Sequence, residues 1–392
     1  MISSKMVKLG SSRSSIRELF EFGKKRKEEI GAENVYDFSL GNPNALAPER
    51  INSSIHEIIE ENPRIHGYTS APGMDSVRES IADYISSSQN FPVSKEELYL
   101  TCGAAASLTI TLKALTVEKD EYIVISPFFP EYKVFIEGQG GKMVIVPSKE
   151  NFDLDIDAVK NSINENTKGV IINSPNNPTG VIYSEERIEE LSQILKDASK
   201  KYEKIIYLIS DEPYREVVFD DTEVPFVPKY YANTIVCYSF SKSLSLAGER
   251  IGYILFPKQI ENYQEAAYAI AGAGRVLGFV NAPALFQAVL GKSIGQFSET
   301  DTYRKNRDLL YKTLTDLGFH CEKPTGAFYL FPKALEEDSV AFCEKAKDFN
   351  LLIVPGDDFY APGYVRLSYC VDPNMVERSL EAFKKLSDYY KK

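Results

Sequence analysis

Short apolar runs rich in β-branched residues recur between about residues 97 and 257. They are ELYLTCG, EYIVISP, GKMVIVP, GVIINSP, KIIYLIS, TIVCYSF and RIGYILF. Residues 184–202 show helical spacing instead, with Ser184 as the N-cap residue and acidic residues in the first turn. Near-continuous apolar strands separated by such helices are typical of a mostly parallel sheet covered on both faces. The pattern therefore predicts the α/β class with a mostly parallel central sheet.

The pattern changes after about residue 285. A long helical stretch over 302–319 is followed by the shorter segments PTGAFYLF and VRLSY and by a last helix ending at Lys392. This texture predicts a second, smaller α+β domain over 286–392, next to a large domain over 49–285. Residues 1–48 are expected to form an N-terminal arm and part of the small domain.

The first seventeen residues lack acids and are rich in Ser, Lys and Arg, as transit peptides are. However, Ser15 and Glu18 have the spacing of a capping box that opens a helix over 16–30. A structured arm is therefore favoured over a removed leader, and the protein is expected in the cytoplasm.

The composition of this 392-residue chain limits the classes of partner and of site that it can have. Hydrophobic residues make up 43% and charged residues 26%, and the net charge is −11. This charge argues against nucleic acid or an anionic membrane as the main partner, and no apolar run approaches the length of a membrane helix. Five scattered cysteines without a CxxC pair and three histidines without metal-binding spacing predict reduced thiols and no metal.

The loops after the predicted strands carry most of the reactive side chains: TCGAAAS, SPFFPEY, NSPNNPTG, SDEPYRE and SFSKSLS. Ligands of parallel sheets bind at this edge. No GxGxxG follows a strand, and neither a Walker A motif nor a GxSxG motif occurs. A lysine that is neutral near pH 7 suits an aldehyde cofactor, whose ring nitrogen stays protonated beside a buried carboxylate. An arginine, hydroxyl groups and a helix N-terminus suit its phosphate.

Three motifs occur in order: NNPTG at 176–180, DEPY at 211–214 and SFSKSLSLAGERIG at 239–252. With them the chain resembles, over nearly its whole length, the class I/II, fold-type-I aminotransferases that depend on pyridoxal 5′-phosphate, and aspartate aminotransferases in particular. The resemblance implies transfer of an amino group from an L-amino acid to a 2-oxo acid such as 2-oxoglutarate. Aspartate is the expected donor, with alanine or aromatic amino acids next.

The same resemblance assigns the reacting centre. Lys242 is implied to bind the cofactor covalently and then to move the substrate proton. Asp211 is implied to pair with the pyridinium nitrogen, and Tyr214 and Asn177 to hydrogen-bond the phenolic oxygen. The plainer alternatives are a surface lysine, a helix-capping aspartate and an asparagine that shapes the Pro-Thr-Gly turn.

Ser239 and Arg250 are implied phosphate ligands, with Ser241 a weaker candidate, and the backbone N–H groups of Gly103, Ala104 and Ala105 suit the phosphate as well. The alanines take the place of a hydroxyl residue that is frequent in the family.

Two aromatic positions follow from the resemblance. Phe129 is implied to stack on the cofactor ring, with Phe128 as the adjacent competitor and core packing as an alternative for either. Tyr68 matches a tyrosine that reaches the phosphate of the neighbouring subunit. A homodimer with shared active sites is therefore expected.

On the substrate side, Arg366 is implied to hold the α-carboxylate, with Gly41 and Asn177 in the same pocket. Arg275 lies near the place where dicarboxylate-specific relatives use a second arginine across the dimer. Recognition of a distal carboxylate and an ion pair in the interface both remain open for it.

Two other functions fit parts of the sequence. A carbon–sulfur β-lyase on the same scaffold would use Lys242 and Asp211 equally well. A regulatory protein with an aminotransferase-like sensor domain is disfavoured, because such proteins carry an appended DNA-binding domain. Only about forty residues precede the LGNPN segment here.

Overall fold

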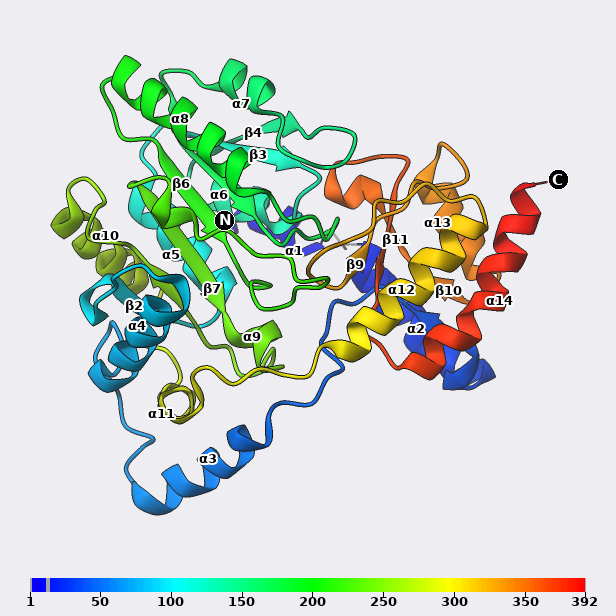
Figure 1. Ribbon diagram of the computed structural model, residues 1–392, viewed down its shortest axis with the longest axis horizontal. Coiled ribbons are helices and arrows are strands. Elements are labelled where there is room, and N and C mark those ends of the chain that lie inside the picture. Colours follow the sequence, from blue (N-terminus) through cyan, green and yellow to red (C-terminus); the bar gives the residue numbers. More distant parts are fainter. Residues whose placement is uncertain (1, 12–14, 392) are drawn as a thin grey trace.

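The computed structural model describes residues 2–11 and 15–391 and shows a large lobe built on a seven-stranded sheet beside a smaller lobe (Figure 1). The strands are β2 (Leu98–Thr101), β3 (Glu121–Ser126), β4 (Lys142–Pro147), β5 (Thr167–Asn173), β6 (Tyr207–Asp211), β7 (Thr234–Ser239) and β8 (Gly252–Leu255), in the order β2-β8-β7-β6-β5-β3-β4. Each of these strands overlaps one of the seven apolar runs in the sequence. Only β8 runs against the other strands of this sheet, so the mostly parallel sheet is confirmed.

Helices cover both faces of the sheet. They are α3 (Glu49–Glu61), α4 (Asp75–Gln89), α5 (Ala104–Leu115), α6 (Glu131–Gly138), α7 (Ile156–Ser162), α8 (Glu185–Lys201), α10 (Tyr263–Val276) and α11 (Ala284–Ser293). Alternate residues of β3 show the two faces, because Val124 packs with α5, α6 and α10 whereas Ile123 packs with α7 and α8. Helix α8 begins as predicted, with the Ser184 hydroxyl accepting a hydrogen bond from the Arg187 N–H at 3.3 Å.

The smaller lobe holds α12 (Asp301–Asp316), α13 (Ser339–Lys347) and α14 (Pro373–Tyr390) around a sheet of β11 (Val354–Pro355), β12 (Val365–Ser368) and β9 (Tyr329–Leu330). Helix α14 thus ends at Tyr390, and the predicted end at Lys392 lies outside the described residues. The predicted boundary near residue 285 falls at the start of α11, which packs with α3 and α4 of the large lobe. The division into domains stays a prediction.

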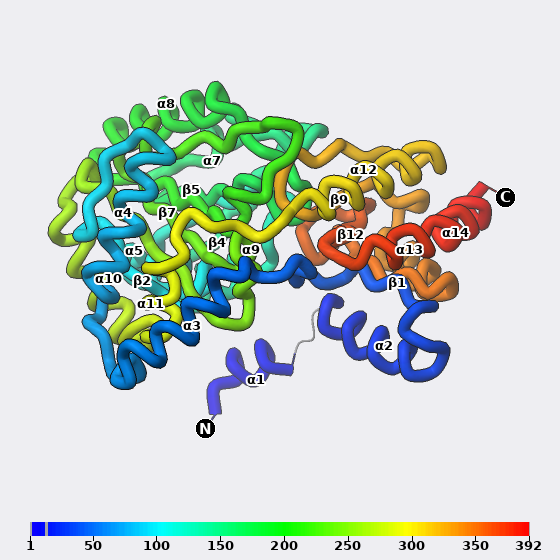
Figure 2. Tube along the Cα trace, turned by 60° about the horizontal axis from the view of Figure 1, so that its bottom comes forward, coloured from blue at the N-terminus to red at the C-terminus, as the bar shows by residue number. Residues whose placement is uncertain are grey.

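The N-terminal arm contacts both lobes: the Lys5 amine of its first helix donates to the Glu137 carbonyl of α6 at 3.0 Å, and its second helix lies against the smaller lobe. Its helices are α1 (Ser4–Ser11) and α2 (Ser15–Ile30), and β1 (Tyr36–Asp37) pairs in parallel with β10 (Leu351–Leu352) (Figure 2). Leu19 of α2 is buried in the same apolar cluster as Leu352. The predicted helix over 16–30 is therefore present, with Ser15 as its first residue.

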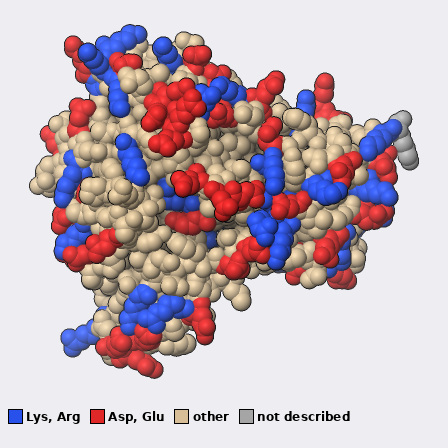
Figure 3. All heavy atoms as spheres, in the orientation of Figure 1, with Lys and Arg blue, Asp and Glu red and all other residues tan. Residues whose placement is uncertain are grey.

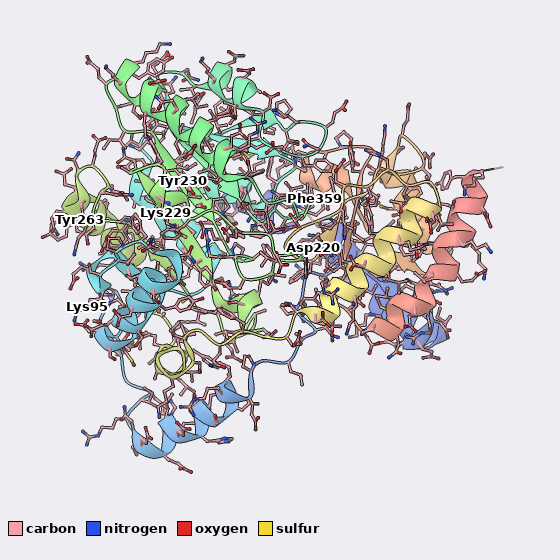
Figure 4. The ribbon with its side chains drawn as sticks, viewed as in Figure 1. Lys95, Asp220, Lys229, Tyr230, Tyr263 and Phe359 are labelled. Atoms are coloured by element: carbon pink, nitrogen blue, oxygen red, sulfur yellow. The ribbon has the colours of Figure 1, made fainter. Side chains whose placement is uncertain are left out.

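An ion pair links the loop after β6 to the smaller lobe. Arg307 of α12 is fully buried; its Nη2 donates to Asp220 Oδ1 at 2.9 Å, and its Nη1, which donates to the Pro324 carbonyl at 3.0 Å, forms an ion pair with Asp220 Oδ2. Asp220 lies beside α12 in Figure 4, and Phe219 supports the guanidinium with its ring 4.7 Å away. An ion pair with a charge-assisted hydrogen bond is among the stronger polar contacts, so this loop is held against the smaller lobe.

Surface features fit the charge balance of the sequence. Acidic and basic side chains are interspersed over both lobes on the face shown in Figure 3. Among residues 2–11 and 15–391, none of the helices combines the length and apolar character that crossing a bilayer requires. All five cysteines are free thiols.

Candidate active site

A pocket of about 320 Å³ lies where β5, β6 and β7 end, next to the first turn of α5. The carboxyl ends of parallel strands meet at one edge of a sheet, which is why loops far apart in the sequence converge there. The predicted site residues that line this pocket are Gly41, Ala104, Ala105, Phe129, Asn177, Asp211, Tyr214, Ser239, Ser241, Lys242, Arg250 and Arg366.

Lys242 is carried by α9 (Phe240–Ser243), a single turn that follows β7 directly. Its amine donates a hydrogen bond to the Gly41 carbonyl oxygen at 2.6 Å. Burial lowers the pKa of Lys242 to about 8, and the nearby Arg366 and Arg250 act in the same direction. A substantial neutral fraction of this amine is therefore present near physiological pH, as a nucleophile or base requires.

Asp211 ends β6 at the floor of the pocket. One carboxylate oxygen accepts a hydrogen bond from the Tyr132 hydroxyl at 2.5 Å, while Oδ1 is buried without a partner. Burial raises the pKa of Asp211 to about 7, with Glu212 adding to the shift and the Tyr132 hydrogen bond opposing it. A buried carboxylate oxygen without a partner is costly, so this atom suits a cationic N–H donor supplied by a ligand.

Arg366, on β12, enters the pocket from the smaller lobe. Its terminal nitrogens donate to the Ser39 carbonyl at 2.6 Å and to the Asn177 side-chain oxygen at 3.2 Å, while Nε is buried without a partner. The rings of Tyr329 and Phe359 lie 4.8 and 4.7 Å from the guanidinium carbon, and Phe359 is labelled between the lobes in Figure 4. Burial lowers the pKa of Arg366. Within the described part of the chain no carboxylate pairs with it, so it can grip a carboxylate from outside.

Tyr214 faces the pocket three residues after Asp211. Its hydroxyl shares a hydrogen bond of 2.8 Å with Tyr329, and burial raises its pKa well above the ordinary value. The Asn177 N–H donates to the Asn173 side-chain oxygen at 2.7 Å. Both side chains are therefore fixed by neighbours before any ligand binds.

Polar groups at the other end of the pocket form an anion cradle. The hydroxyls of Ser239 and Ser241 lie 2.7 Å apart, and Arg250 Nη1 is 3.5 Å from the Ser241 oxygen. Gly103, just before α5, has φ +87°, and a Cβ there would come within 2.9 Å of Arg250 Nη2. Only glycine lets the arginine approach the N–H groups of this helix. Arg250 itself has φ +53°, a conformation with a cost of about 1–3 kcal/mol that functional sites often carry.

The two phenylalanines of SPFFPEY have different surroundings. Phe128 is buried and stacks on Tyr360, with ring centroids 4.7 Å apart and planes inclined by 19°. Phe129 lines the pocket. The choice of Phe129 over Phe128 as the ring next to a ligand thus has the support of this packing.

Two predicted residues lie away from the pocket of the same chain. The Tyr68 side chain is 95% exposed, and Arg275 is exposed in the last turn of α10. Both were expected to act across a dimer, so their roles stay predictions.

Several pocket residues escaped the sequence analysis: Ile16, Leu108, Asn173, Pro213, Ala247 and Tyr329 line it, and Tyr132 supports Asp211 from beneath. Asn173 and Tyr132 belong to the segments NSPNNPTG and SPFFPEY, which follow predicted strands. Their place in these segments was a signal that could have identified them. Ile16 and Tyr329 come from distant segments, and no local pattern marks them.

A family model for class I and II aminotransferases matches residues 32–383. The chain belongs to this family. The aminotransferase is 30% identical to an aspartate aminotransferase of Thermotoga maritima, over 98% of this chain and 99% of that relative. Its fold superposes with a TM-score of 0.98 on an amino transferase from Eubacterium rectale, at 52% identity and with full coverage of both chains. It superposes on a structure of the aspartate aminotransferase of Thermus thermophilus with maleate with a TM-score of 0.87 and 25% identity. That match covers 98% of this chain and 100% of the other.

The aminotransferase uses pyridoxal 5′-phosphate, as its family does, and the residues present fit that group. Oδ1 of Asp211 has an open position for a protonated ring nitrogen, and the cradle around Arg250 suits a phosphate. Among the described residues, His, Cys, Asp and Glu nowhere gather in threes as metal ligands. The predicted family, fold class, enzyme class and cofactor are confirmed.

Proposed function

We propose that this aminotransferase moves the amino group of aspartate to a 2-oxo acid such as 2-oxoglutarate. Relatives with near-complete coverage that are named aspartate aminotransferase support the choice of donor. One observation carries the chemistry: Lys242, Asp211 and Arg366 line one pocket, and among the described residues neither Asp211 Oδ1 nor Arg366 Nε has a hydrogen-bond partner.

We assign the holding of the cofactor to four side chains. Arg250, Ser239 and Ser241 take the phosphate together with the first N–H groups of α5, and Asp211 holds the ring nitrogen protonated. Bound in this way, pyridoxal phosphate supplies an electron sink for the substrate α-carbon. Tyr214 and Asn177 donate to its phenolic oxygen, and Phe129 covers one ring face and excludes water.

Arg366 orients the substrate by gripping the α-carboxylate with two parallel hydrogen bonds, which directs the α-hydrogen toward Lys242. Lys242 Nζ would take that proton and later give one back, so the amine would end the exchange unchanged. Its lowered pKa suits both halves of the exchange, because a base works best near its operating pH.

A homodimer with shared active sites is part of the proposal. Exposed apolar side chains occur at Tyr68, Val276 and Val280. Gln287 joins their segments, since its amide donates to the Thr69 hydroxyl at 3.0 Å and to the Ala282 carbonyl at 2.7 Å. A second copy would cover this surface. Free thiols at all five cysteines support a cytoplasmic location.

The test is a panel of amino donors with 2-oxoglutarate as the acceptor and purified protein. Aspartate is expected to give the highest kcat/KM. A dominant signal from alanine or an aromatic amino acid would overturn the donor and leave the reaction type standing. Release of pyruvate and ammonia from cystathionine without an acceptor would instead indicate the β-lyase.

Uncharged donors are the second candidate, because part of the pocket lining is apolar. Ile16, Ala104, Ala105 and Phe129 line it, and its only cations from the described residues are Lys242, Arg250 and Arg366. A distal carboxylate therefore needs a cation from outside this chain's own pocket wall.

Arg275→Leu is expected to lower kcat/KM for aspartate by about 10²-fold and to leave an aromatic donor within about twofold, because it removes one charge-assisted contact. Kinetics with both donors on the same preparation provide the measurement. Arg304→Leu, which removes an exposed arginine of the smaller lobe, is the matched control. Unchanged aspartate turnover would leave Arg275 as an interface ion pair.

A further inference from the structure

A chain of three hydrogen-bonding side chains lies behind the helical turn that carries Lys242. The Tyr238 hydroxyl donates to the Glu216 carboxylate at 2.8 Å and lies 2.9 Å from the Ser243 hydroxyl. Ser243 is the residue after Lys242. Tyr238 packs in the core cluster of α3, α4 and α11, whereas its neighbour Cys237 packs with α5 on the other face of the sheet.

The turn depends on such contacts more than a long helix would. Helix α9 has only four residues, and one isolated turn gains few backbone hydrogen bonds for the order it demands. Ser243 is 3% exposed and is held twice, through its hydroxyl by Tyr238 and through its carbonyl, which accepts from the Ser298 N–H at 2.8 Å. The position of Lys242 therefore depends on what holds Ser243.

The tyrosine is itself held rigidly. Its ring stacks on Tyr253, with centroids 4.7 Å apart and planes inclined by 17°, and meets Phe240 edge-on at 5.0 Å. Since the single Tyr238 proton goes to Glu216, Ser243 must donate its proton to the Tyr238 oxygen. A proton on Glu216 can reverse both bonds, which turns Ser243 from donor to acceptor.

We propose that Glu216, Tyr238 and Ser243 form a protonation-sensitive brace that positions α9 and thereby the Lys242 amine. The three are positioning residues, because none of them lines the cofactor pocket. The inference rests on the proposed role of Lys242.

The surroundings of Glu216 support a change in the charge of its carboxyl group near neutral pH. Burial raises the pKa of Glu216 to about 7, Glu212 adds to the shift, and Tyr238 and Arg215 oppose it. The titratable and charged groups that face Glu216 are Tyr84 from α4, Tyr238 from β7, Tyr253 from β8, and Glu212 and Arg215 from its own loop. Residues 293–297, which line a cavity of about 20 Å³ beside it, carry no charge.

The test is a pH titration of the holoenzyme, followed by the visible absorbance of the lysine-bound cofactor. This absorbance reports the proton on the Lys242 nitrogen, so it responds to the position and surroundings of that atom. Glu216→Gln keeps an acceptor for Tyr238 but cannot ionise. Tyr238→Phe keeps the ring and removes both hydrogen bonds.

The wild type is expected to titrate in two coupled steps, one of them near the pKa of Glu216, and Glu216→Gln in a single step. Tyr238→Phe is expected to shift the midpoint and to lower kcat about tenfold at an unchanged donor KM, because the carboxylate grip is untouched. Tyr84→Phe, which removes a hydroxyl beside the same small cavity, should match the wild type.

Titration curves of Glu216→Gln and Tyr238→Phe that both superimpose on the wild-type curve would overturn the brace. If Tyr238→Phe does not fold, the pH titration curve of Ser243→Ala is compared with the wild-type curve in its place, and superposition overturns the brace. A wild-type protein that never acquires visible absorbance with added cofactor would refute the role of Lys242 instead, so the two failures are distinguishable.

Discussion

Lys242→Ala is expected to lower kcat by at least about 10⁴-fold, because one amine supplies both the attachment point and the acid–base group. Borohydride treatment of the wild-type holoenzyme should leave a covalent cofactor adduct at position 242, and the variant should leave none. Mass spectrometry of the digested protein and turnover with the best donor provide the two measurements.

The variant should stay folded. It removes a buried amine with a lowered pKa; among the described residues the Gly41 carbonyl loses a hydrogen-bond donor, and the rings of Tyr214 and Phe328 lose a cation more than 5 Å from their centroids. The control is Lys113→Ala, which removes an exposed lysine from α5 and should keep wild-type turnover. If Lys242→Ala keeps its activity and carries as much adduct at another residue, Lys242 is not the residue that binds the cofactor.

Asp211→Asn is expected to lower kcat by about 10³-fold and, at the same time, to stabilise the protein without its cofactor. The loss arises because a neutral amide cannot hold the ring nitrogen protonated. The gain arises because Oδ1 is buried without a partner and burial raises the Asp211 pKa to about 7. Keeping that charge costs the folded apoprotein roughly 4 kcal/mol at pH 8.

The pH dependence separates this effect from a general change in packing. The pKa of Asp211 is higher in the folded than in the unfolded chain, so its charge destabilises the fold increasingly as pH rises from about 4 to about 7. The melting temperature of the apoprotein should therefore rise in Asp211→Asn at pH 8 and rise less at pH 5. Equal melting temperatures of variant and wild type at both values would contradict the account.

Local sequence patterns were sufficient for the sheet, and the family resemblance supplied most of the residues that line the pocket. The runs around Val124, Ile171 and Ile209 are apolar on both sides, and both sides are buried against helices in the structure. The loops after these strands had to meet at one edge. That geometric rule predicted the edge at which a ligand binds, and the resemblance to the aminotransferase family implied the roles of Asn177, Asp211 and Lys242 there.

Residues that depend on the meeting of distant segments were not predictable in this way. Tyr132, in the first turn of α6, donates to Asp211 at the end of β6, and nothing in its own segment indicates that contact. Tyr329 reaches Tyr214 from β9, across the junction of the lobes. Phe128 and Phe129 are identical in type, and only packing separates them. The roles predicted for Tyr68 and Arg275 would need a second copy of the chain.

The pocket draws on both ends of the chain. Ser15 donates to Asp358 at 3.0 Å across 343 positions, and Ile16 beside it faces the same cavity as Arg366. During synthesis the apolar side of α2 stays uncovered until the last strands leave the ribosome. Catalytic competence is therefore among the latest properties this polypeptide acquires, and a nascent chain stalled before β12 would have the Lys242 turn without the arginine that faces it.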